Sequence, residues 1–281
     1  MIKFLIVSRR KHDLTRKRFF YEWAFIHVSL MLHTLPSMQR FRRYVQHFAN
    51  PDIPDEFRVL PRSTMNWESI AEHWLERFDP AGGGPEYVEQ MQPHKFSDSA
   101  MEIAYVQGEV AYRRDDFRSG GVKVVHRLLK RPNQTIEDFR RHWRDTHVPL
   151  LIATLKNRGL RKYELDSPYE FDPALFHDVR KGSLFEQANI DPAQGFEELW
   201  FDSLDDAMRI GSDPTVRATL SASYGGFVDV GRSHSMIANE RVVYDYVTPG
   251  EISPRPAVLD STTLDAVIFK TGRPYHEPRL K

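Results

Sequence analysis

Apolar residues along this chain fall into two arrangements, short alternating runs and stripes at helical spacing. The segments IKFLIV (2–7) and VKVVHRLL (122–129) are short, apolar and rich in β-branched side chains, which is typical of strands. After the second segment, Phe139, Trp143 and His147 recur every four residues and so share one stripe of a helix. Thr135 is the expected N-cap of that helix, and Asp138 follows three residues later as a weak capping box.

The same pattern is written twice. Residues 2–31 align with 122–151 without a gap, and WAFIHVSLM at 23–31 is echoed by WRDTHVPLL at 143–151. Matches continue beyond these segments and pair Tyr44 with Tyr163, Glu72 with Glu198, and Trp74 with Trp200. Two copies of this length indicate a fused pair of related units rather than a solenoid.

Each copy is expected to fold as a ferredoxin-like β-α-β-β-α-β unit, so the predicted fold class is α+β. The expected domains are a first unit at 1–115, a second unit at 122–245 and a C-terminal arm at 246–281. A second helix is expected from Leu204, with Ser203 as its N-cap.

Two long proline-rich stretches, 50–66 and 167–195, separate the expected second and third strands of the two units. Loops of such length in a compact domain usually serve as lids or binding segments. We expect the 167–195 loop to close a pocket in the second unit.

Composition limits the classes of function. The chain has 39 Lys and Arg against 39 Asp and Glu, and this balance argues against a nucleic-acid surface, which needs a basic excess. The absence of cysteine excludes disulfides, thiolate catalysis and Cys-ligated zinc. No other metal-ligand spacing is present, and we expect neither metal nor cofactor. The apolar start is too short for a signal sequence or a membrane span, so a cytoplasmic protein without membrane contact is expected.

The spacing T-x-x-x-F-x-x-x-W-x-x-x-H-V at 135–148, followed by GLRKY and WFDSL, resembles the signature of the EthD family of the dimeric α+β barrel superfamily. The signature is clear in the second unit, degenerate in the first and absent from the arm. The resemblance implies two ferredoxin-like sheets that close one barrel within the chain, and a homodimer is also possible. Relatives include accessory proteins of ether and aromatic degradation and cofactor-free cyclases, dehydratases and isomerases. The wider superfamily has haem-binding members.

His147 is the first candidate for chemistry. It stands just before Val148 and Pro149, and this proline is expected to break or kink the helix, which would let the imidazole face a cavity between helix and sheet. The alternative is a histidine that caps the helix end, although the family signature favours the pocket. Its counterpart His27 lies in an almost wholly apolar segment, which favours a core role.

Two further residues are candidates for acid–base chemistry. His126 stands where the first unit has Ile6, which indicates a pocket specialised in the second unit; the alternative is a hydrogen-bonded residue on a wetter face. Glu198 on the third strand is a candidate partner for His126. The alternative for Glu198, slightly favoured, is an ion pair with Lys3 or Lys123.

We therefore expect a cofactor-independent lyase or isomerase for an aromatic small molecule, with His147, His126, Glu198 and His27 as candidate catalytic residues. Elimination, dehydration, retro-aldol cleavage and cyclisation all fit such a site. The alternative is a non-catalytic or haem-binding barrel protein accessory to aromatic or ether degradation. The candidate substrate contacts are aromatic or basic residues of the second unit: Trp143, Tyr163, Phe139, Trp200, Tyr169, Phe176, His177 and Arg180.

Overall fold

The computed structural model describes residues 1–29, 41–50, 52–80, 96–190 and 193–247. Its strands are β1 (Ile2–Ser8), β2 (Phe41–Ala49), β3 (Ser69–Leu75), β4 (Glu102–Arg113), β5 (Gly121–Leu128), β6 (Leu160–Pro168), β7 (Gly195–Phe201) and β8 (His234–Asp245). Its α-helices are α1 (Arg16–Tyr21), α5 (Ile136–His142), α6 (Val148–Leu155), α7 (Pro173–Arg180), α8 (Leu204–Ser212) and α9 (Pro214–Phe227). Two π-helical turns, η1 (Glu22–His27) and η3 (Trp143–His147), and two 3₁₀ turns, η2 (Asp55–Phe57) and η4 (Leu184–Gln187), complete the described helices.

The strands form one closed antiparallel barrel in the order β1-β3-β2-β8-β5-β7-β6-β4. Two quartets make it up, a first quartet β4-β1-β3-β2 and a second quartet β8-β5-β7-β6, which meet where β2 pairs with β8 and β4 with β6. The barrel therefore closes within one chain, as expected. In the first unit, the segment between β3 and β4 that would carry a second helix includes 81–95, which lies outside the described residues. Two complete ferredoxin-like units, and the division into domains, thus stay predictions, as does the arm, of which 248–281 lie outside the described residues.

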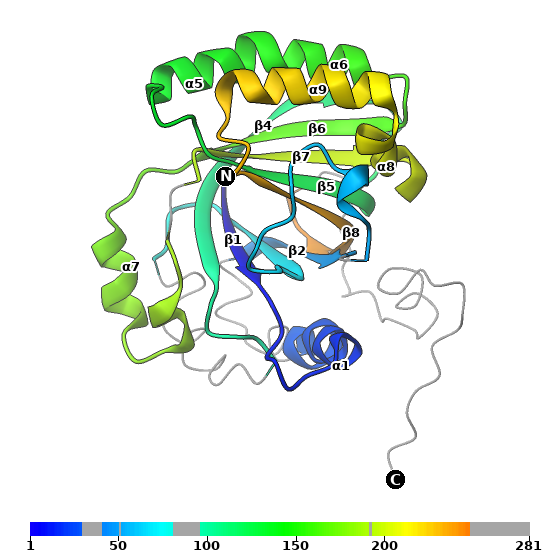
Figure 1. Cartoon of the computed structure of the whole chain (residues 1–281). Helices are drawn as coiled ribbons and strands as arrows, with labels where there is room; N and C mark the ends of the chain where they lie inside the picture. The colour runs from blue at the N-terminus through cyan, green and yellow to red at the C-terminus, as the bar shows by residue number, and fades with distance from the viewer. Residues whose placement is uncertain (30–40, 51, 81–95, 191–192, 248–281) are drawn as a thin grey trace.

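Helices cover the two quartets from outside the barrel. In Figure 1, α5, α6 and α9 lie across the strands β5, β7 and β6, and α1 lies on the opposite side of the molecule below β1 and β2. Because strand side chains alternate, Val122, Val124 and Leu128 face the helices of the second quartet, whereas Val125 belongs to the cluster that also holds Phe196 of β7. The helix–sheet interface and the barrel interior are thus separate environments. No helix of the described residues is long and apolar enough to cross a membrane.

Local sequence signals explain where the helices begin. The Thr135 hydroxyl accepts from the backbone N–H of Asp138 at 3.0 Å, and Thr15 in the first copy accepts from Arg18 at 3.2 Å. The Ser203 hydroxyl likewise accepts from the N–H of Asp206 at 3.1 Å, which confirms the predicted start of α8. Each cap satisfies a backbone donor that the first turn of a helix leaves without a partner.

The repeated phrase forms a π-helical turn in both copies. Trp143 and His147 bound η3, and the first copy has the same turn from Glu22 to His27. The expectation that Pro149 breaks the helix is wrong, because α6 continues directly from η3 with this proline in its first turn. The first copy has Ser29 at the equivalent position and still forms its π turn. Such turns are frequent at functional sites.

Each of the two long loops packs on the quartet of strands that did not supply it. The 167–190 segment packs on the first quartet, where Phe171 contacts Phe78 and Arg180 lies over Phe4. Residues 53–60 pack on the second quartet, and η2 approaches Gly211 of α8 so closely that a Cβ there would lie 2.2 Å from Phe57. The predicted lid of the second unit therefore covers the first quartet instead, because its aromatic residues join the first core cluster.

Candidate functional site

A cluster of polar side chains lies between the helices and the sheet of the second quartet, with the Glu197 carboxylate at its centre. Glu197 and His126 stand directly opposite each other on β7 and β5, so their side chains share the face below the helices. Trp143 and His147 belong to η3, Tyr224 belongs to α9, and Tyr163 belongs to β6. None of these six side chains is more than 2% exposed, so the cluster is enclosed by protein.

Both oxygens of Glu197 accept hydrogen bonds. Oε1 accepts from the Trp143 indole N–H and from the Tyr163 hydroxyl, both at 2.5 Å. Oε2 accepts from the Tyr224 hydroxyl at 2.6 Å and lies 3.1 Å from His126 Nδ1. The Tyr224 oxygen is also 2.7 Å from His126 Nδ1. Because Tyr224 has one proton and donates it to Glu197, this geometry assigns the donor role to His126 Nδ1–H.

His147 connects the π turn to the same carboxylate. Its Nδ1 is 2.8 Å from the Ser223 hydroxyl of α9, and its Nε2 is 3.3 Å from Glu197 Oε1. The imidazole packs against the rings of Tyr224 and Phe227 at centroid distances of 4.3 and 5.0 Å. His147 therefore faces the space between helix and sheet, as expected, rather than capping a helix end.

The surroundings set the protonation of this cluster. Burial acts to raise the pKa of Glu197, but the charge of His147 and the hydrogen bond from His126 hold it well below its usual range. Burial and the neighbouring Glu197 raise the pKa of Tyr163 and of Tyr224 well above that of a free phenol. At neutral pH the cluster thus holds an ionised carboxylate and two protonated phenols.

Glu198 lies on the opposite face of β7, inside the barrel. It contacts Lys123, and its Oε1 is 3.3 Å from Lys3 Nζ. The ion-pair alternative is therefore confirmed, and Glu198 is not a partner of His126. The residue that the sequence analysis missed is Glu197, because a shift of one position along a strand moves a side chain to the other face.

The barrel interior holds a network of ion pairs around the two repeated lysines. Lys3 Nζ lies 2.7 Å from Glu164 and 2.9 Å from Asp166, and Lys123 Nζ lies 3.2 Å from Glu240. Burial acts to lower the pKa of Lys123, yet its carboxylate neighbours raise it above its usual value, so the ammonium keeps its charge. Trp200, a predicted substrate contact, lies over Lys123 at 4.2 Å. Carboxylates outnumber the two lysines here, and burial together with the charges of Glu198 and Glu164 raises the pKa of Asp166 well above its usual value.

The other predicted site residues fall in three places. Phe139 packs in the core of the second quartet, within 5.6 Å of Trp143, measured between ring centroids. Tyr169, Phe176 and Arg180 lie with the loop that packs on the first quartet, and His177 of α7 is exposed there. His27 is buried against Phe96, which agrees with the core role that its apolar helix indicates.

A sequence signal for Glu197 existed in the repeat itself. In the first quartet Ile6 stands opposite Ala71, and the equivalent pair in the second quartet is His126 and Glu197. Both members of an apolar pair are thus replaced by polar residues at once, the same asymmetry that singled out His126. Tyr224 and Ser223 of α9 carried no comparable signal.

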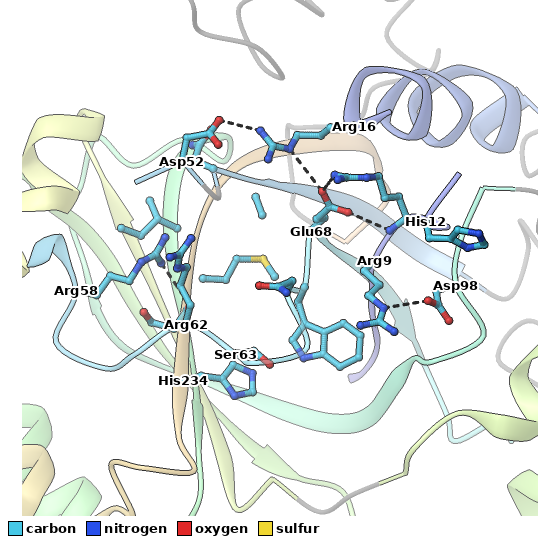
Figure 2. Close-up of a pocket in the computed structure, with 18 residues that line it drawn as sticks. Arg9, His12, Arg16, Asp52, Arg58, Arg62, Ser63, Glu68, Asp98 and His234 are labelled. Atoms are coloured by element: carbon cyan, nitrogen blue, oxygen red, sulfur yellow. Dashed lines mark hydrogen bonds and ion pairs between the residues drawn. The ribbon is translucent and has the colours of Figure 1, made fainter. Parts of the chain in front are cut away.

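A cavity of about 540 Å³ opens at the barrel end where β1 and β2 finish and β8 begins. Figure 2 shows Arg58 and Arg62 on one side of it, Arg16 with Glu68 and Asp52 on another, and Arg9 with Asp98 on a third. Arg9 and Arg10, which directly follow β1, both line this cavity. Burial and the nearby charges of Arg127 and His126 lower the pKa of His234, another lining residue, to about 4.

Comparisons with known proteins bear on the family and the fold. The family described as EthD domain matches residues 131–231, and this range includes every residue of the Glu197 cluster except His126. A solved structure named as an anthrone oxidase-like protein matches with a TM-score of 0.51 and 9% identity, over 89% of this chain and 96% of that chain. A candidate monooxygenase from Lactobacillus acidophilus matches with a TM-score of 0.42 and 10% identity, over 86% of this chain and 94% of that chain. Another candidate monooxygenase, from Fusobacterium nucleatum, matches with a TM-score of 0.45 and 7% identity, over 86% of this chain and 93% of that chain. No curated protein matches the chain.

The reaction class expected from the sequence needs correction. The anthrone oxidase-like protein shares this fold, and its name denotes an oxidation rather than a lyase or isomerase reaction. The prediction of a lyase or isomerase is therefore wrong, whereas the haem-binding alternative stays an untested prediction. The match to the family description and the closed barrel agree with the resemblance seen in the sequence. Residues 131–231 match the EthD domain, and they lie within the closed antiparallel barrel that the described residues form.

Proposed function

We propose that this protein is an enzyme that oxidises a small aromatic substrate with an acidic C–H bond, using O₂ as the oxidant. The observation that carries the proposal is the convergence of two imidazoles, two phenols and an indole on one buried carboxylate, Glu197. The shared fold with a protein named anthrone oxidase-like supports oxidation as the reaction class.

Each residue of the cluster has a role that its contacts suit. An imidazole, of His147 or His126, takes the proton when the substrate C–H bond breaks, and imidazole is the usual base for this step at neutral pH. The Glu197 carboxylate, 3.3 Å from His147 and 3.1 Å from His126, stabilises the imidazolium that results. Tyr224 is kept protonated by burial and by Glu197, which raise its pKa; in the complex its hydroxyl turns from Glu197 and donates to the oxygen of the substrate anion.

The electrons then leave the substrate for O₂. The carbanion gives its electron pair to O₂, one oxygen atom stays on carbon as a ketone, and the other leaves as water with two protons from the substrate. For anthrone, C₁₄H₁₀O and O₂ give C₁₄H₈O₂ and H₂O, which balances atoms and charge. The apolar core around the cluster favours this chemistry because it shields the anion from water.

In this proposal the substrate reaches the cluster along the seam between α9 and the helix α5–η3. His142 and Phe227 close that seam by stacking at 5.1 Å. At its outer end lies a hollow of about 360 Å³, lined by residues 131–134 and Gly226. The π turn η3 forms one side of the seam and holds its two cluster residues, Trp143 and His147, at its ends.

The test measures O₂ uptake and ketone formation by the purified full chain with anthrone and with dithranol. We expect uptake with the wild type, and a loss of about 10²–10⁴ in kcat for His126→Gln and Tyr224→Phe, as is usual when an acid–base group is removed. His177→Gln, on the exposed face of α7, is the matched control and should stay fully active. The proposal fails if neither substrate consumes O₂, or if both cluster variants, folded by circular dichroism, keep wild-type rates.

A further inference from the structure

The cavity at the barrel mouth carries an inference of its own, independent of the oxidation proposed above. Its lining combines cationic and apolar side chains that come from segments far apart in the sequence. They include Arg58, Arg62, Asn50, Trp67 and Met236. A volume of about 540 Å³ is within the range of small-molecule sites.

Three of the arginines are already neutralised by the carboxylates of the lining. Arg9 donates to Asp98 at 3.0 Å, Arg10 pairs with Glu68, and Arg16 donates to Asp52 at 2.8 Å. Figure 2 shows Arg9 with Asp98, and Arg16 with Asp52, on the two sides of the cavity away from Arg58. On these sides the cavity offers little net charge to a ligand.

Arg58 differs from them, because the carboxylate that it approaches belongs to Asp55, which also pairs with Arg62. Asp55 lies outside the cavity lining, 2.8 Å from Arg62 Nε but 3.6 Å from Arg58 Nε, and its side chain is 57% exposed. Burial, together with the nearby charge of Arg62, lowers the pKa of Arg58 to about 10. The Arg58 guanidinium is itself only 2% exposed and donates to carbonyls at 3.3 and 3.4 Å. One wall of the cavity therefore carries a buried, under-compensated positive charge.

The lining also contains buried donors without hydrogen-bond partners among the described residues. They are Arg58 Nε, Asn50 Nδ2 and Trp67 Nε1, and each of these atoms can only donate. Buried polar atoms are nearly always hydrogen-bonded in folded proteins, so a group of orphaned donors around one cavity indicates a missing acceptor.

The apolar side chains of the lining indicate the chemistry of the remaining part of the ligand. Trp67, Met236, Ala49 and Ile237 line the same cavity, and they continue into the apolar cluster of the barrel interior through Met236 and Ala49. A flat hydrocarbon body suits these side chains, whereas a bare inorganic anion would leave them in contact with water.

We propose that this cavity is a binding site for an aromatic carboxylate, with the carboxylate on Arg58 and Arg62 and the ring against Trp67 and Met236. A guanidinium presents parallel N–H donors that match the two oxygens of a carboxylate. The orphaned donors of Asn50 and Trp67 lie in the same lining and complete the set that an acceptor-rich ligand would satisfy. Every residue of the lining lies outside the EthD match at 131–231.

The experiment compares binding of 2-naphthoate and of uncharged 2-naphthamide to the full chain by isothermal titration calorimetry. Because charge-assisted hydrogen bonds are the stronger kind, we expect the acid to bind at least about tenfold more tightly than the amide. Arg58→Gln should weaken the binding of 2-naphthoate by about tenfold or more and leave the binding of 2-naphthamide unchanged. Arg114→Gln, which changes a partly exposed arginine directly after β4, is the matched control and should change neither.

Arg62→Gln provides a second test in case Arg58→Gln does not fold, because the Arg62 side chain is 43% exposed and its removal should not disturb the core. It should also weaken 2-naphthoate selectively. The proposal is overturned if the wild type does not bind 2-naphthoate at millimolar concentration, if acid and amide bind equally, or if the Arg62 and Arg114 variants behave alike.

Discussion

At the scale of single residues, one position of strand register separates two different uses of a carboxylate. Glu197 and Glu198 are neighbours in sequence, yet Glu197 accepts from two phenols and an indole below the helices, while Glu198 neutralises lysines inside the barrel. The second copy of the repeat differs from the first at His126 and Glu197 together, where the first has Ile6 and Ala71. This coordinated change is what makes the second quartet the place of the proposed chemistry.

His147 provides the prediction at this scale. Replacing it with glutamine keeps a donor and an acceptor near Ser223 and Glu197 but removes the imidazole that could act as the base. We therefore expect His147→Gln to fold with a nearly unchanged melting temperature and to lose about 10²–10⁴ in kcat for O₂ uptake with anthrone.

His27→Gln is the internal comparison, because His27 occupies the same place in the first copy and packs against Phe96. It should lower the melting temperature and leave kcat intact. A fully active His147→Gln would show that this histidine has a structural role.

At the scale of elements, the repeated phrase specifies a π turn as well as a helix. Both copies widen at the same place, between the tryptophan and the histidine, and both helices start at a threonine N-cap. Since the first copy has Ser29 in place of a proline and still forms its π turn, the turn does not require the missing N–H at Pro149. The π turn thus belongs to the fold, and the second copy adds to it the polar partners His126 and Glu197.

Pro149→Ser tests this explanation by giving the second copy the residue that the first copy has. We expect the π turn to persist and the free energy of unfolding to change by no more than about 0.5 kcal/mol, as for most exposed substitutions. Urea unfolding followed by far-UV circular dichroism measures both effects. A large loss of stability, or of helical signal, would restore the proline as the cause.

At the scale of the whole molecule, two quartets of strands depend on charges that cross the barrel. Lys123 of β5 contacts Glu72 of β3 at 3.4 Å, and Lys3 of β1 contacts Glu164 of β6 at 2.7 Å. The long loops add a second link, because each packs on the quartet that did not supply it. The two halves are therefore expected to unfold together.

Lys123→Met measures the contribution of the interior charges. It leaves Glu198, Glu72 and Glu240 buried with one cation fewer, and breaking a buried ion pair from one side typically costs about 3–5 kcal/mol. Urea unfolding should show that loss, whereas Arg114→Met, which breaks an exposed pair with Asp202, should cost far less. Equal effects of the two changes would contradict a stabilising role for the interior network.

His73 makes the stability of the fold depend on pH. Burial beside Phe41 and Tyr44 and the charge of Arg180 lower its pKa from 6.5 to about 3. Between these values the unfolded chain binds a proton that the native histidine does not, so stability is lost as pH falls below 6.5. The loss is about 1.4 kcal/mol per pH unit for this group.

His73→Phe keeps an aromatic ring and removes the titration. Urea unfolding at about pH 7, 6 and 5 should therefore give a shallower decline for the variant than for the wild type. Parallel declines would show that His73 does not contribute to the pH dependence.

The sequence by itself determined the features that depend on near neighbours. The strand segments follow from alternation and β-branched residues, the helix starts from Thr135 and Ser203, and the internal repeat from the shared Trp and His. It also indicated His126 and His147 as members of one site. His126 departs from the repeat, where the first copy has Ile6, and His147 belongs to the repeated spacing of Trp and His.

Tertiary structure alone decided which residues meet. Side chains on a strand alternate with a period of two, so the choice between Glu197 and Glu198 depends on a register that pairing and packing set. The exchange of the long loops, the arrival of Tyr224 from α9, and the cavity between Arg58 and Trp67 each join segments far apart in the chain. Such contacts form only because folding buries apolar surface throughout the molecule, and no local pattern specifies them.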